Sequence, residues 1–219
     1  MGVYHSLKNI IIRNLILSMK KYTALLILFF IGFILSGIQP HDYFTWILEV
    51  FPAIVAILIL IITFKKIQFT DLTYIFILVH CYILFIGGHY TYAQVPLFDW
   101  IKDVFHQSRN NYDKVGHFAQ GFIPALVVRE LFVRFEIVKP GKWLSFLTVC
   151  VCMTISACYE LFEWLVAILS GQSSEAFLGT QGDPWDTQSD MLFALIGAVC
   201  MVLFVSKIQD HNIRKLNVP

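Results

Sequence analysis

The sequence predicts an all-α, polytopic membrane protein with six transmembrane helices and both termini in the cytoplasm. Apolar residues make up 58% of its 219 residues and charged residues only 14%. Mean hydropathy is +0.70, well above the usual balance of a soluble domain. The apolar residues form continuous runs without two-residue alternation, which argues against a transmembrane β-barrel. We therefore expect one membrane domain built from packed helices, covering residues 1–219.

Six apolar runs are long enough to cross a hydrocarbon core about 30 Å thick, which requires roughly 20 residues per helix. Residues 1–21 are expected to be a basic cytoplasmic tail, either an amphipathic helix on the inner surface or a charged segment that sets topology. Residues 22–208 form the bundle, with 72–207 as its functional core, and 209–219 form a second cytoplasmic tail. The predicted spans are Tyr22–Ile38, Tyr43–Phe64, Leu72–Gly88, Lys114–Phe135, Trp143–Leu169 and Pro184–Lys207.

The distribution of charge predicts how the protein is oriented. Thirteen of the 16 lysines and arginines fall on the side of the termini, which leaves Lys102, Arg109 and Lys114 for the other side. Because basic residues are retained in the cytoplasm, both termini are expected there. Most acidic residues instead lie in outward loops or in the outer halves of spans. We therefore expect any chemistry to face outward.

The first two spans carry little ionisable chemistry apart from Glu49 and are expected to act as scaffold. The longest loop, residues 88–111, places apolar side chains at helical spacing from Leu97 to Phe105. This pattern predicts a short helix at the outer membrane surface. It is either a linker that rests on the membrane or a lid or guide for lipid.

The fourth span begins with a titratable pair, Asp113 and His117. The four-residue spacing places both on one helical face about 6 Å apart along the axis, and Gln120 continues that face. A carboxylate one turn from an imidazole can hold its tautomer, as a general acid or base requires. The pair predicts a catalytic His117 that Asp113 orients. The alternative is a capping aspartate and a histidine whose hydrogen bonds are satisfied in the bundle core.

Two further carboxylates, Glu160 and Glu163, lie three residues apart within the apolar fifth span. A carboxylate at membrane depth costs on the order of 2.5–3.5 kcal/mol on insertion scales, so both must face the interior of the bundle. There they act as metal ligands, as acid–base groups or as structural hydrogen-bonding partners.

The entry to the last span reads "GTQGDPWDTQSDM", residues 179–191. Asp183 before Pro184 is typical of a helix N-cap, and Asp186 occupies the position of an acidic capping box. Capping does not explain Asp190, which lies one turn further along the Asp186 face.

The polar residues of these spans are expected to converge in one outward layer. Many carboxylates with one or two histidines suit a hard divalent cation such as Mg²⁺ or Mn²⁺. The predicted catalytic residues are His117, Asp113 and Glu160, and the predicted metal ligands are Glu163, Asp186 and Asp190. Predicted substrate contacts are His89, Gln120, Gln181 and Asp183.

The favoured hypothesis is an outward-facing enzyme of cell-envelope metabolism that acts on phosphoester headgroups of lipids or lipid carriers. It would be a metal-assisted hydrolase or a headgroup transferase, with membrane lipids or a lipid-linked molecule as its partners. The alternatives are a proton- or cation-coupled transporter and a non-catalytic membrane scaffold. A net charge of +1 gives no support for a nucleic-acid partner, and oligomeric state is left open.

The chain resembles the YjdF family of bacterial inner-membrane proteins over nearly its whole length, which implies an inner-membrane location. The stretches that carry the resemblance are "GGHYTYAQVP" (87–96), "YDKVGHFAQGFIPA" (112–125), "YELFEW" (159–164) and "FLGTQGDPWDTQSDM" (177–191).

A more distant pattern is similar to VanZ-like membrane proteins, which are associated with glycopeptide resistance. It consists of Asp-Lys-x-x-His on one span, a glutamate on the next and an aspartate-rich entry to the last. The resemblance implies a four-helix core acting on envelope phosphoesters, with Asp113, His117, Glu160 and Asp190 as core positions and His89 added by the third span. The chain departs from that pattern where a glutamine and an arginine are expected, and offers Glu163 and Gln181 instead.

Overall fold

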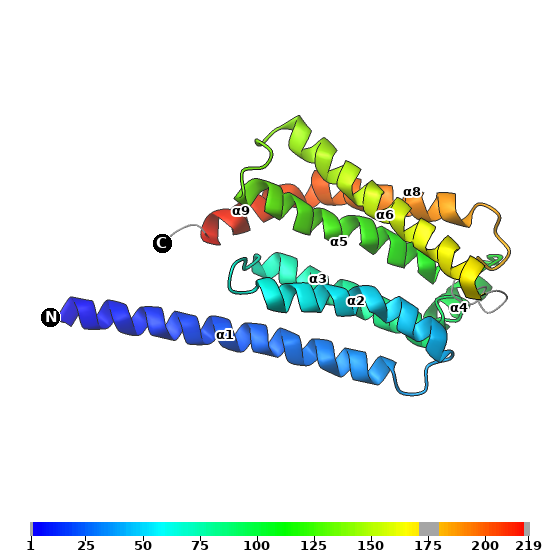
Figure 1. Cartoon of the computed structure of the whole chain (residues 1–219), viewed down its shortest axis with the longest axis horizontal. Helices are drawn as coiled ribbons and strands as arrows, with labels where there is room; N and C mark the ends of the chain where they lie inside the picture. Colours follow the sequence, from blue (N-terminus) through cyan, green and yellow to red (C-terminus); the bar gives the residue numbers. More distant parts are fainter. Residues whose placement is uncertain (1, 171–179, 217–219) are drawn as a thin grey trace.

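The computed structural model describes residues 2–170 and 180–216, with side chains from residue 19 onward. Within these ranges every regular element is a helix, which confirms the all-α class. Figure 1 shows an elongated bundle of long helices lying roughly side by side. Residues 177–179, at the start of the last family-like stretch, lie outside the described residues.

The helices lie close to the predicted spans. The main helices are α1 (Gly2–Ser36), α2 (Tyr43–Thr63), α3 (Asp71–Tyr90), α5 (Tyr112–Arg134) and α6 (Lys142–Ser170). The last span is a continuous rod made of α8 (Asp186–Cys200), the π-helical segment η2 (Met201–Val205) and α9 (Ser206–Leu216).

Two boundaries differ from the sequence prediction. The first helix runs without interruption from Gly2, so the helical part of residues 1–21 continues directly into the first span. The last helix begins at Asp186 rather than at Pro184, because residues 184 and 185 form a turn and no side chain caps the helix.

Among residues 2–170 and 180–216, five helical segments are long and apolar enough to cross a membrane. They are Met19–Ser36, Tyr43–Thr63, Asp71–Tyr90, Lys142–Ser170 and Asp186–Leu216. The remaining predicted span, α5, has 23 residues but carries charged residues at both ends. It packs against α3, α6 and α8, in the middle of the bundle. The sixth crossing therefore stays a prediction.

Figure 1 places the start of α1 and the end of α9 at the same end of the bundle. This arrangement is the one that an even number of crossings requires. The assignment of that end to the cytoplasm stays a prediction.

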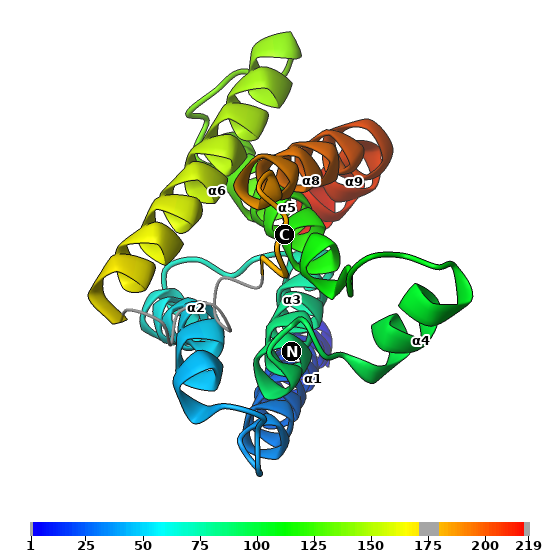
Figure 2. The same ribbon diagram turned by 90° about the vertical axis from the view of Figure 1, so that its right-hand side faces the viewer.

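The bundle consists of two groups of helices that α3 and α5 join. In the first group, α1 and α2 both pack against α3 around a core that includes Phe29, Val50 and Phe85. In the second group, α5, α6 and α8 pack around Leu126 and Cys152. Figure 2 shows α2 and α6 on the same side of the bundle, each in a different group.

The closest helix contact joins α5 to α8 through two glycines. A methyl group at Gly121 would overlap the carbonyl oxygen of Ala194, and one at Gly197 would overlap that of Phe118. Small residues at a membrane helix interface let the two backbones approach closely. This contact fixes the separation of α5 and α8 directly below the polar layer.

The short helix predicted in the longest loop is present as α4 (Pro96–Val104), and its position at the membrane surface stays a prediction. Its apolar side chains are open to the surroundings: Leu97 and Trp100 are each 61% exposed and Phe105 is 67% exposed. A helix with such an exposed apolar face suits the membrane surface. Asn110 ties the loop down, since its side chain donates to the carbonyl of Val95 and to Asp99.

At the opposite end of the bundle, a buried carboxylate ties α5 to the start of α3. Glu130 is fully buried and accepts hydrogen bonds from the backbone N–H of Thr70 (2.8 Å) and from the hydroxyl of Thr73 (2.6 Å). Arg134 lies 3.4 Å from the same carboxylate. The two helix groups are thus joined at this end by a satisfied polar network.

Replacing Gly121 by alanine is expected to lower the free energy of unfolding by about 1–3 kcal/mol. The added methyl group meets backbone of α8, which cannot rotate aside as a side chain would. The measurement is the thermal unfolding midpoint of the purified protein in detergent.

The matched control is Gly32→Ala, where the new methyl group would lie 2.8 Å from the ring of Tyr82, a side chain that can rotate. A smaller loss is expected there. Equal midpoints for both variants and the unmodified chain would contradict the tight α5–α8 contact.

Candidate functional site

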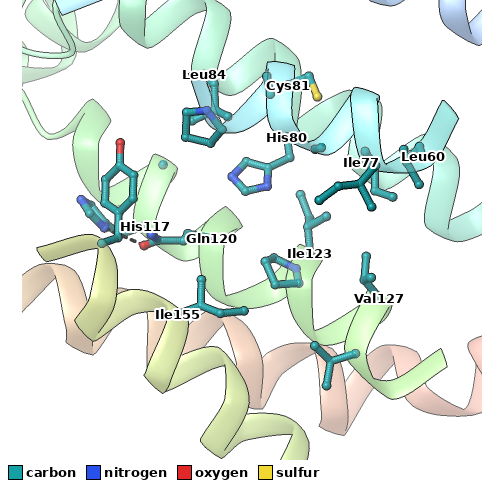
Figure 3. Close-up of a pocket in the computed structure, with 18 of the residues that line it drawn as sticks. Leu60, Ile77, His80, Cys81, Leu84, His117, Gln120, Ile123, Val127 and Ile155 are labelled. Carbon is teal, nitrogen blue, oxygen red and sulfur yellow. Dashed lines mark hydrogen bonds between the residues drawn. The ribbon is translucent and has the colours of Figure 1, made fainter. Parts of the chain in front are cut away.

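A pocket of about 460 Å³ lies between the two groups of helices. Its walls come from α2, α3, α5, α6 and the start of α8, and Figure 3 shows His80 extending from α3 toward Gln120 and Ile123 of α5. One end of the pocket is polar and the remainder is apolar. The polar lining consists of Glu49, His80, Tyr92, Asp113, His117, Gln120, Tyr159, Glu163 and Asp190, together with Thr63 at the far end of the α2 wall.

A buried ion cluster joins α5 to α8 beside this polar end. The ammonium of Lys114 lies 2.9 Å from Asp186 Oδ1 and 2.8 Å from Asp190 Oδ1, and 3.4 Å from Asp113. All four side chains are at least nine-tenths buried. A buried cation held by three carboxylates satisfies charges that would otherwise be costly at this depth.

Arg109, in the loop before α5, completes the ion cluster. Its guanidinium donates to Asp113 and, at 2.5 Å, to Asp186, and it lies 3.4 Å from Asp183. Burial acts to lower the pKa of Arg109, but the hydrogen bond to Asp186 and the charge of Asp113 outweigh it and raise the pKa. Arg109 therefore stays charged and ties the loop to both helices.

The structure corrects the predicted pairing of Asp113 with His117. Both lie on α5, but the Asp113 carboxylate binds Arg109 and Lys114. The nearest partner of His117 is Gln120, whose Oε1 lies 3.0 Å from Nδ1. Asp190 Oδ2 lies 3.6 Å from Nε2, and Glu160 Oε1 lies 3.8 Å from Nδ1. The imidazole is thus positioned by Gln120, Glu160 and Asp190, not by Asp113.

The two glutamates of α6 face the interior, as predicted. Glu160 is 7% exposed and Glu163 is 8% exposed, and Glu163 lines the pocket. In the part of the chain that the structure describes, Glu160 Oε1 is buried without a hydrogen-bond partner. A buried carboxylate oxygen of this kind requires a further positive or hydrogen-donating group.

Within the part of the chain that the structure describes, two sets of side chains could hold a metal ion by geometry. One is His117, Glu160 and Asp190, and the other is Asp113, Asp186 and Asp190; in each set the donor atoms lie within 4.8 Å of one another. The second set already surrounds the ammonium of Lys114. Asp186 is therefore neutralised by side chains of the protein, which shifts the candidate metal site from the predicted Glu163, Asp186 and Asp190 to the first set.

Three predicted substrate contacts have structural partners instead. The Gln181 side chain pairs with both the backbone N–H and the carbonyl of Asn110. Asp183 accepts from the N–H of Trp185 at 2.9 Å. His89 Nδ1 lies 2.9 Å from the carbonyl oxygen of Ser36, and the ring does not line the pocket. Gln120 does line the pocket, as expected for a substrate contact.

The sequence interpretation missed Arg109, Lys114 and His80. The sequence does contain an indication for Arg109 and Lys114, because they are two of only three basic residues assigned to the outward side, where most of the acidic residues lie. His80 lies within an apolar run of α3 with no polar residue at helical spacing to mark its direction. Its position in the pocket follows only from the packing of α3 against α5.

Comparison with known proteins decides the family. Residues 21–211 match the family model described as predicted membrane protein (DUF2238). The chain is 44% identical to the inner membrane protein YjdF of Escherichia coli (strain K12) over 207 residues, which cover 94% of this chain and 97% of that protein.

The chain belongs to this family. Together with its apolar helices, this makes it a multi-pass inner-membrane protein. The range matched by the family model, residues 21–211, spans the whole pocket lining and the ion cluster of this chain. No solved structure matches the chain. The likeness to VanZ-like proteins stays a prediction.

Replacing Lys114 by methionine is expected to lower the free energy of unfolding by about 3–5 kcal/mol, since removing one partner leaves buried carboxylates uncompensated. Adding Asp190→Asn to this variant removes one of those carboxylates and is expected to recover part of the loss. Thermal unfolding in detergent measures both effects.

The control is Lys102→Met, because Lys102 forms a partly exposed pair with Asp99. An exposed pair contributes about 0–1 kcal/mol. If Lys114→Met were as stable as Lys102→Met, the ion cluster would not stabilise the fold.

Proposed function

We propose that this protein is a cation-assisted enzyme that acts on the phosphoester headgroup of a membrane lipid or lipid carrier at the outer face of the inner membrane. The reaction is hydrolysis or headgroup transfer in cell-envelope metabolism. One observation carries the proposal: His117 and Asp190, which with Glu160 form a group that could hold a metal ion, line a pocket whose long remaining lining is apolar.

The charge balance of the site supports a divalent cation. Within the described residues, the two buried cations of the ion cluster, Arg109 and Lys114, face Asp113, Asp186 and Asp190, so one negative charge is left over before α6 is counted. Glu160 and Glu163 add two more carboxyl groups nearby. A phosphoester anion cannot approach such a surplus of carboxylates unless a cation offsets it.

The donor set fits a hard divalent ion. Two carboxylates and one imidazole leave coordination positions for water and for phosphate oxygens, which is how Mg²⁺ and Mn²⁺ commonly bind. Glu160 Oε1, which has no hydrogen-bond partner within the described residues, would gain the cation as a partner in this arrangement. A bound cation would polarise the phosphoester and neutralise developing charge. In this assignment His117 is a ligand rather than the acid–base residue expected from sequence.

In this proposal Glu163 moves the proton. It lies one helical turn from Glu160 and lines the pocket that His117 and Asp190 also line. The oxygen of a water molecule bonds to phosphorus as Glu163 takes its proton, and the bond from phosphorus to the leaving oxygen breaks. That oxygen then receives the proton from Glu163. In a transferase, the hydroxyl group of a second lipid takes the place of water.

Proton- or cation-coupled transport is the second candidate function, and Glu49 and His80 favour it. Both line the pocket from the α2–α3 side, and Asp113, Glu163 and Asp190 line it from the other group. Titratable groups on both walls of one pocket are what a proton relay requires. A scaffold without activity predicts instead that replacing these groups changes stability alone.

Mn²⁺ is expected to bind the purified protein, and Glu160→Gln is expected to weaken that binding by at least 10- to 100-fold, because one charged ligand is lost. The measurement is the electron paramagnetic resonance signal of free Mn²⁺ during titration. Asp103→Asn, an exposed residue of the outer loop, is the control and should bind as the unmodified protein does. Equal affinity for both variants would contradict a cation at Glu160.

Lipid chemistry is tested by mass spectrometry of bacterial phospholipids and polyprenyl phosphates incubated with the protein and Mg²⁺ or Mn²⁺. A headgroup change is expected with the unmodified chain, and a folded His117→Ala variant, which lacks one cation ligand, should be slower by at least roughly 10- to 100-fold. Asp103→Asn is again the control.

If all lipids stay unchanged, the enzyme proposal fails. A pH change inside proteoliposomes that depends on Glu49 would then favour coupled transport.

A further inference from the structure

The whole pocket is a groove that follows the helix axes, with most of its polar side chains toward one end. Its α2 wall runs from Glu49 to Thr63, and its α5 wall runs from His117 to Leu131. Each wall covers 14 residue steps, which at 1.5 Å per residue is about 21 Å. Beyond the polar end, the lining is almost entirely aliphatic and includes Ala56, Leu60, Ile77, Ile123, Val127 and Ile155.

The groove opens sideways between α2 and α6. The closely packed pairs α2–α3, α3–α5 and α5–α6 form its floor and flanks, whereas α2 and α6 are not such a pair. Ile59 of α2 and Ile155 of α6 line the groove and are also 55% and 38% exposed. In a membrane this opening faces the hydrocarbon chains of the lipids.

We propose that the groove holds one acyl chain of a phospholipid, with the phosphate of that lipid at the His117, Glu160 and Asp190 end. The proposal rests on the proposed function and names its substrate class. A leaflet of hydrocarbon is about 15 Å deep, half of the bilayer core, so a groove of about 21 Å accepts one extended chain of a leaflet-forming lipid. A polyprenyl chain is much longer and would leave most of its length outside.

The test maps where the end of an acyl chain lies. The full-length protein is reconstituted in vesicles of phosphatidylethanolamine and phosphatidylglycerol containing a little phosphatidylglycerol with a diazirine at the end of one acyl chain. After irradiation, labelled residues are identified by mass spectrometry. Labels are expected on Leu60, Val127 or Leu131, in addition to lipid-facing residues such as Leu203.

Two neighbouring residues of α2 give a matched pair of variants. Ile59 lines the groove, while Leu58 is 52% exposed and does not. Ile59→Trp adds an indole at the opening and is expected to reduce groove labelling by about tenfold, since a filled groove cannot take a chain as well. Leu58→Trp is expected to leave it unchanged, and Leu203 should be labelled equally in every sample.

Labels confined to lipid-facing residues, or groove labelling that Ile59→Trp does not reduce, would overturn the proposal. So would a polyprenyl phosphate bearing the same diazirine that labels the groove in preference to the phospholipid, since the ligand would then be a lipid carrier. Labelling requires no turnover. Groove labelling without any headgroup change would therefore support the acyl-chain site while the enzyme proposal fails.

Discussion

The burial of Lys114 and Arg109 among the carboxylates of Asp113, Asp186 and Asp190 is the constraint on which the polar layer depends. Charges at this depth are tolerated only while they remain paired. Separating α5 from α8 would break several ion pairs together, and the glycine contact one turn below already holds the two backbones together. His117 and Asp190, which lie on these two helices, are held in position by the same contacts.

The ion cluster also decides which carboxyl groups are available for chemistry. Asp113 and Asp186 are occupied by basic side chains, so their role is to set the local charge and hold the helices. Glu160 comes from α6, which contributes no lysine or arginine to this layer. Its oxygen faces His117 without a hydrogen-bond partner in the described residues. Glu160 is therefore available because it lies outside the ion pairs of α5 and α8, whereas Asp190 belongs both to those pairs and to the candidate cation site.

Sequence reasoning predicted the helices, the inward faces of Glu160 and Glu163 and the convergence of Asp190 with His117, because helical periodicity and the cost of buried charge fix these features. Sequence reasoning paired Asp113 with His117 because helical spacing identifies neighbours on the same helix and gives no information about partners on other elements. The competing partner, Arg109, lies in a loop whose path depends on tertiary contacts. The contact at Gly121 and His80's place in the pocket likewise depend on how separate helices meet.

The two walls of the pocket are held by interactions of different strength. The α5–α8 side is fixed by buried ion pairs and backbone contact, whereas α2 is held mainly by apolar packing against α3, with Gly88 close to Trp46 and Glu49. Apolar contacts between membrane helices stabilise the folded state little, because the same side chains make similar contacts with lipid chains when the helices separate. A chain that enters between α2 and α6 would therefore displace α2 more readily than α5. The polar end would keep its geometry while the apolar wall adapts, which is the arrangement that a site for variable acyl chains and a fixed headgroup requires.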